Sequence, residues 1–236
     1  DAGFYFQWGD TKGYTANQVG TGDGKKKFAD DWSDYKWGVD PNFTKYTFQT
    51  TLELEDDAAH VNWGGDWHMP SGVQIQELID NTTTAWTTSD GVSGVTFTSK
   101  KDNTKSIFFP VEGYASDGSV LDGAGYGYVW SSMLSTNSFT DGLLLYFNMD
   151  EVCLSDNLGR GAGVSVRGII ETSGNTNGHS YVDLGLPSGT LWAAQNVGAS
   201  KPSDVGFYFQ WGDTKGYTAE QVGRDEGKKL FGWYDY

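Results

Sequence analysis

The sequence predicts a β-rich α+β fold with few short helices and long loops, on the basis of three observations. Glycine is abundant and proline is scarce, with 33 Gly and 5 Pro in 236 residues. Aromatic residues are frequent, with 10 Trp, 13 Tyr and 13 Phe, and they favour strands and loops that rest on a core. Short runs of apolar and β-branched residues alternate with Gly, Asn, Asp and Ser, which is typical of strands joined by turns.

One stretch of the sequence occurs twice. Residues 3–20 read GFYFQWGDTKGYTANQVG, and residues 206–223 read GFYFQWGDTKGYTAEQVG, an offset of 203 residues with one difference in 18 positions. The similarity continues more loosely, so that Lys25, Lys26 and Phe28 match Lys228, Lys229 and Phe231. We call residues 3–28 the first copy and residues 206–231 the second copy. The chain therefore contains one period of a repeat and the opening of another.

The first third of the chain is predicted to contain one helix. Residues 1–40 combine an aromatic cluster with a Gly/Lys/Asp-rich stretch, which indicates a short strand and a long surface loop. Residues 41–55 are rich in β-branched and aromatic residues, and the acidic Asp56–Asp57 turn after them is expected in solvent. Ser71 can cap a helix over about residues 71–80, where apolar residues follow an imperfect helical period.

The rest of the chain indicates strands. Residues 84–114 read as three strands joined by an Asp-Gly and an Asp-Asn turn. Three more strands are predicted within residues 125–133, 142–155 and 163–170. Residues 171–180, ETSGNTNGHS, have the composition of a flexible linker.

Composition limits the function classes. The net charge of −15 argues against nucleic acid or an anionic membrane as the main partner. Cys153 is the single cysteine, so there is no intrachain disulfide framework, and we expect it to be a small buried apolar residue. No apolar run is long enough to span a membrane. We interpret the acidity as a source of solubility and predict no cofactor and no metal site, with structural calcium in the acidic loops as the alternative.

Several strings carry a family resemblance. YVDLGLPSGTLWAAQNVGA, YFQWGDT, LELEDDAAHVNWGGDWHMP, and YVWSSM followed by LLLYFN and SVRG resemble the Fibrobacter succinogenes major paralogous domain family. That family is similar to the C-type-lectin-like fold of formylglycine-generating enzymes. The resemblance implies a C-type-lectin-like domain in a secreted or surface-displayed protein of Bacteroidetes-like bacteria.

The order of the strings sets the expected domain organisation. In the family, the YVDLGLPSG element begins the domain and precedes YFQWGDT, whereas here it occurs once, at residues 181–189. We therefore predict a C-type-lectin-like domain over residues 1–170 that lacks its own first strand, and a linker over residues 171–180. Residues 181–236 then form the N-terminal part of a second repeat copy, which completes this domain or a neighbouring unit.

The residue types argue against an enzyme. A lone Cys153 cannot supply the cysteine pair that the resemblance to formylglycine-generating enzymes would require. His60, His68 and His179 lack metal-ligand spacing. The carboxylates of residues 55–57 could in principle serve glycoside hydrolysis, but adjacent acidic residues at a strand end are usually solvated. A carbohydrate-active enzyme stays as the remote alternative.

Three sets of residues are assigned roles. The structural core is predicted to include Trp63, Gly64, Gly65, Trp67, Trp130 and Arg167. The resemblance places ligands near the last strands, and the candidates that could bind a sugar by ring stacking and amide hydrogen bonds are Asn137, Tyr146, Asn148, Asp150, Asp156, Asn157 and Arg160. The residues predicted to take part in assembly are Tyr181, Leu184, Leu186, Phe207, Phe209 and Trp211.

These expectations combine into one functional hypothesis and one main rival. The hypothesis is a non-catalytic, extracellular or cell-surface repeat protein that forms a structural or adhesive filament from copies of itself. One domain has room for one copy of the duplicated segment, so residues 204–236 are expected to dock onto or complete an adjacent unit by head-to-tail contact. The rival is a lectin-like display domain that binds glycans or host-surface proteins.

Overall fold

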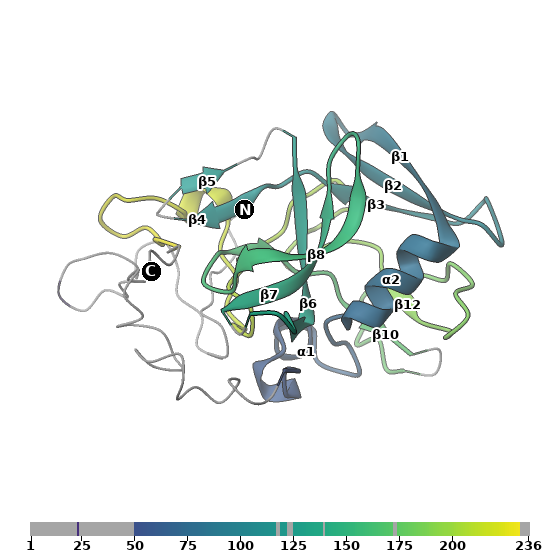
Figure 1. Cartoon of the computed structure of the whole chain (residues 1–236), viewed down its shortest axis with the longest axis horizontal. Helices are drawn as coiled ribbons and strands as arrows, with labels where there is room; N and C mark the ends of the chain where they lie inside the picture. The colour runs from purple at the N-terminus through teal and green to yellow at the C-terminus, as the bar shows by residue number, and fades with distance from the viewer. Residues whose placement is uncertain are drawn as a thin grey trace.

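The computed structural model describes residue 23 and residues 50–231, apart from 117–118, 122–124, 139 and 172–173. Within these residues the fold is α+β and rich in strands, as predicted, and the first copy and the other predictions for residues 1–49 lie outside them (Figure 1). The largest sheet has the strand order β13-β9-β6-β7-β8, and the smaller sheets are β1-β2-β3, β10-β12-β11 and β4-β5. The strands are β1 (Thr82–Ser89), β2 (Val92–Ser99), β3 (Ser106–Pro110), β4 (Tyr114–Ser116), β5 (Ser119–Leu121), β6 (Gly127–Leu134), β7 (Asp141–Phe147), β8 (Val152–Gly159), β9 (Val164–Ser165), β10 (Ile169–Ile170), β11 (Tyr181–Val182), β12 (Leu191–Ala193) and β13 (Tyr208–Phe209).

The predicted helix is confirmed as α2 (Gly72–Asn81). The hydroxyl of Ser71 accepts a hydrogen bond from the backbone N–H of Gln74, and the Gln74 side chain accepts one from the N–H of Ser71. This capping box satisfies two backbone donors at the start of the helix. Ile75 and Leu78 are buried, in a different apolar cluster from Trp63 and Trp67.

A second helix, α1 (Ala58–Trp63), begins where we expected a solvated acidic turn. Asp56 and Asp57 are buried, so that expectation is wrong. The Asp57 carboxylate accepts hydrogen bonds from the N–H of His60 at 2.9 Å and from the N–H of Met69 at 2.8 Å. Asp57 therefore caps α1 and ties it to the chain that leads into α2, and burial raises the pKa of its carboxyl.

The strand predictions were correct where turn residues were clear. Asp90 and Gly91 have φ of 50° and 82°, and they join β1 to β2 in the left-handed region that a tight hairpin turn requires. Residues 142–155, predicted as one strand, instead form β7 and β8. Their turn forms because the Asn148 side-chain oxygen accepts hydrogen bonds from the N–H groups of Asp150 and Glu151. Residues 163–170 likewise divide into β9 and β10.

The segment predicted to be a flexible linker is attached to the helical region by hydrogen bonds. The indole N–H of Trp67 donates to the carbonyl of Thr176 at 2.6 Å, and the N–H of Asn175 donates to the Asp66 carboxylate at 2.6 Å. His179 stacks on the ring of Trp63. Residues 174–180 are therefore linked to the helical region by specific contacts.

The core consists of two apolar clusters. One contains the predicted core residues Trp63, Trp67 and Trp130, and it also includes Phe209 and Trp211 of the second copy. The other lies around Phe97, Phe109, Phe147 and Trp192, between α2 and the sheets. Gly64 and Gly65 have φ of 65° and 60°, in the left-handed region that glycine adopts readily, and they connect the two tryptophans. Cys153 in β8 is half-buried rather than fully buried, and burial raises the pKa of its thiol to about 11.

Candidate functional site

The second copy lies in a site formed by its own chain. β13 pairs with β9, so that Tyr208 lies opposite Ser165 and Phe209 opposite Val164. The backbone N–H of Trp211 donates to the carbonyl of Arg160 at 3.0 Å. We call the receiving residues the acceptor site, and they are Glu112, Trp130, Ser131, Arg160, Gly161, Gly163, Val164, Ser165 and Val197.

The aromatic side chains of the second copy also form specific hydrogen bonds. The Tyr208 hydroxyl donates to the carbonyl of Glu112 at 2.5 Å. The indole N–H of Trp211 donates to the carbonyl of Ser131 at 2.5 Å. In return, the indole N–H of Trp130 donates to the carbonyl of Phe209 at 2.6 Å. The rings are buried, so each hydrogen bond satisfies a polar group that water does not reach.

The remainder of the second copy folds back over this strand. Tyr208 and Tyr217 exchange two backbone hydrogen bonds, of 2.9 and 3.0 Å. Phe231 packs against Gly163 so closely that a Cβ on this glycine would lie 2.1 Å from the ring. Gly163 is therefore needed to admit the last aromatic residue of the segment.

The residues predicted for assembly thus contribute to the fold of their own chain. Phe209 and Trp211 are fully buried, and Leu184 and Leu186 are buried in the second cluster. Phe207 is half-buried, and Tyr181, at 47% exposure, is the one large side chain of the set that faces solvent. Residues 204–231 occupy the acceptor site in the same molecule, which is one of the two arrangements that the sequence left open.

The predicted ligand-binding residues form two separate groups. Asp156 in β8 accepts hydrogen bonds from Asn137 at 2.9 Å and from Ser135 at 2.8 Å, which lower the pKa of its carboxyl. Tyr146, Asn148 and Asp150 lie around the β7–β8 turn, and the Asn148 amide donates to the Tyr146 hydroxyl at 2.6 Å. The four residue-to-residue steps along β8 from Val152 to Asp156 span roughly 13 Å. One small sugar therefore does not contact both groups.

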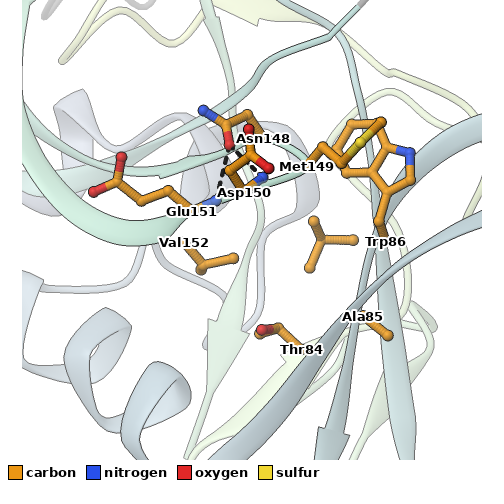
Figure 2. A pocket seen from close by; sticks show the side chains of 9 residues that line it. Thr84, Ala85, Trp86, Asn148, Met149, Asp150, Glu151 and Val152 are labelled. Atoms are coloured by element: carbon orange, nitrogen blue, oxygen red, sulfur yellow. Dashed lines mark hydrogen bonds between the residues drawn. The ribbon is translucent and has the colours of Figure 1, made fainter.

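A shallow cleft lies beside the turn group (Figure 2). Trp86 of β1 lines it together with Asn148, Met149 and Asp150, and its volume is about 90 Å³. Ligand pockets usually enclose roughly 300 Å³ or more. The Asn148 side chain is already occupied by the turn, as the dashed lines in Figure 2 show.

The other two ligand candidates differ in environment. Asn157 is exposed on β8, and its side-chain oxygen accepts a hydrogen bond from Ser155 at 2.7 Å. Arg160 is fully buried, so its assignment as a ligand-binding residue at the surface is wrong. Its backbone carbonyl instead receives the second copy.

The histidines have structural contacts. Nδ1 of His60 lies 3.2 Å from the carbonyl of Trp67, and Nδ1 of His68 lies 3.0 Å from the carbonyl of Asp66. The stacking of His179 on Trp63 has a centroid distance of 4.3 Å. His60 and His68 border a cavity of about 450 Å³. These contacts hold the three imidazole rings in place.

An acidic group lies near the start of α1. Ligand atoms of Glu53, Glu55 and Asp56 lie within 4.8 Å of one another. Exposed carboxylates gather in many proteins without an ion, so structural calcium stays a prediction.

Arg167 and the acceptor-site residue Glu112 are two buried ionisable groups. Arg167 was predicted as a core residue, whereas Glu112 was not predicted. Arg167 is fully buried, and its guanidinium donates to the side chain of Asn196 at 2.6 Å and to the carbonyls of Ala193 and Phe108 at 3.0 Å each. Burial lowers the pKa of Arg167 to about 9. Burial also raises the pKa of Glu112 well above its usual value, against the opposing charge of Arg167. The sequence held no signal for Glu112, because a Pro-Val-Glu-Gly string reads as an exposed loop.

This environment leads to a prediction of pH dependence. The folded-state pKa of Glu112 lies above its usual value of 4.5, so the folded state holds the proton more tightly than the unfolded state. The free energy of unfolding should therefore fall as pH rises from about 4.5 towards the folded-state pKa. Glu112→Gln imitates the protonated form and should remove this fall, so the variant should be more stable than the parent at pH 7. Urea unfolding between pH 4 and pH 8 measures it.

The exposed Glu151 provides the matched control. Glu151→Gln should leave the pH profile of stability as it is in the parent. A Glu112→Gln profile that stays parallel to that of the parent would contradict the assignment.

Comparisons with known proteins add no assignment. The chain matches no family model, and no curated protein and no solved structure gives a significant match. The resemblance to the Fibrobacter succinogenes major paralogous domain family therefore stays a prediction from the sequence strings. Among the described residues, no helix is long and apolar enough to cross a membrane.

Proposed function

We propose that this chain is a non-catalytic, extracellular repeat unit of C-type-lectin-like architecture that builds a structural or adhesive assembly by head-to-tail association. One observation carries the proposal: a segment that the sequence contains twice fills a single, buried place in the domain. The second copy supplies a strand of the largest sheet and several fully buried aromatic rings, among them Phe209 and Trp211. The domain is therefore completed by residues that belong to the start of the next repeat.

The strand order supports the architectural part of the proposal. β10, the last strand before residue 171, pairs antiparallel with β12 of the YVDLGLPSGTLWA string. Lectin-like folds bring their first and last strands together in this way. The same arrangement lets an element from one repeat close the sheet of another.

The duplication supports association. The described residues form one acceptor site, filled by the second copy, and the sequence contains that segment twice. The copy that does not fill the site carries the same aromatic residues. Leaving the apolar surface of those residues in water would cost about 25 cal/mol per Å². A neighbouring molecule offers the surface that removes this cost. The structural contacts of His60, His68 and His179 support a role without catalysis.

Light scattering on the full chain and on a chain that ends after Ser203 tests the proposal. The mass of the full chain should increase with concentration, and electron micrographs should show filaments. The shortened chain has lost the copy that fills the acceptor site in this structure, so it should not form the filaments of the full chain. The same assemblies from the shortened chain, or a full chain that is monomeric at every concentration, would disprove head-to-tail association.

A further inference from the structure

We propose that the acceptor site also binds the first copy of the duplicated segment, donated by a second molecule of this chain. The proposal rests on the proposed function and names the surface that links the molecules. The exchange would place residues 3–28 of one molecule where residues 206–231 of the other lie in this structure.

The pattern of differences between the two copies carries the inference. Over the 26 aligned positions, from residue 206 to residue 231, the copies differ at five. Four of these positions are exposed and the fifth is half-buried; they are Glu220, Arg224, Asp225, Glu226 and Leu230. Every fully buried position of the second copy has the same residue in the first copy. The acceptor site therefore has no buried contact that distinguishes one copy from the other.

The specific contacts of the acceptor site all fall on shared residues. The first copy supplies Tyr5, Phe6 and Trp8 at the positions of Tyr208, Phe209 and Trp211. The hydroxyl that reaches the Glu112 carbonyl and the indole N–H that reaches the Ser131 carbonyl are thus available from either copy. The aromatic residue against Gly163 is also shared, because Phe28 corresponds to Phe231.

The energetics favour exchange at high concentration. Replacing one copy by the other makes the same buried contacts, so the balance is set by concentration and by the connecting chain. Exchange of an identical element between molecules is a low-cost route to association. Strand addition along β9 provides backbone hydrogen bonds, and the aromatic side chains provide specificity.

Complementation with a peptide tests the proposal. In the full chain, Trp8→Ala and Trp211→Ala together weaken both copies and leave the acceptor site intact. A synthetic peptide of residues 3–28 should then bind this variant, and at 100 times its Kd it should raise Tm by about 5–10 °C. The same peptide with Trp8→Ala is the matched control and should give little shift. An unchanged Tm with the unaltered peptide, or equal shifts with both peptides, would overturn the proposal.

Two further measurements keep the test decisive. Should the double tryptophan variant fail to fold, Phe6→Leu with Phe209→Leu gives the same comparison at a smaller loss of packing. The mass of the unaltered chain separates this inference from the proposed function. Assemblies without peptide binding would leave the function standing and remove the exchange, whereas a chain that never associates would remove both, even if the peptide binds.

Discussion

Replacing Arg167 by methionine is expected to cost about 4 kcal/mol or more in the free energy of unfolding. The guanidinium holds the carbonyl of Phe108 in β3, the carbonyl of Ala193 in β12 and the side chain of Asn196. Methionine would leave these buried acceptors unpaired, at about 1–3 kcal/mol each, and would also remove the packing over the Phe109 ring. Urea unfolding at pH 7 measures the loss, and a fall in Tm of roughly 10 °C should accompany it.

Two controls separate geometry from charge. Arg167→Lys keeps the charge but replaces a planar group that donates in three directions, so it should recover only a minor part of the loss. Combining Arg167→Met with Glu112→Gln removes the buried carboxylate that Arg167 faces, so at pH 7 Glu112→Gln should stabilise the Arg167→Met variant by more than it stabilises the parent. An Arg167→Met variant that melts within two degrees of the parent would show that these hydrogen bonds contribute little.

The sequence predicted the elements whose signals are local. The helix after Ser71 was found because its capping residues and apolar period lie within one short stretch. The β1–β2 hairpin was found because Asp90-Gly91 specifies a tight turn. By contrast, Asp57 was misread as solvated, because its partner Met69 is twelve residues away and local composition carries no record of that contact.

The acceptor site could not be predicted from local sequence either. The duplication indicated that the second copy completes a domain. It did not indicate whether that domain belongs to the same molecule or to a neighbour, because the sequence is the same in both cases. The answer depends on Gly163, Val164 and Ser165, which read as an ordinary strand until β13 is placed beside them. The ligand hypothesis failed at Arg160 for a related reason, since burial is set by segments distant in sequence.

Trp67→Ala is expected to cost about 3–5 kcal/mol, the usual range for removing a large aromatic side chain from a core. The indole is fully buried, packs edge-to-face on Trp63 at a centroid distance of 5.2 Å and donates to the carbonyl of Thr176. Its loss would therefore open a cavity and free the segment that leads from β10 to β11. Thermal unfolding should show Tm lower by roughly 10 °C.

Val73 on α2 supplies the control for this experiment, because its side chain is 76% exposed. Val73→Ala removes apolar atoms that already contact water, so its effect should stay within about 0.5 kcal/mol. Hydrogen exchange adds a local readout: in Trp67→Ala, the amide of Asn175, which donates to Asp66, should lose protection before the amides of β6 and β7 do. If the two variants unfold at the same temperature, Trp67 does not hold the first cluster together, and the core has to be centred on Trp130 and Trp211 instead.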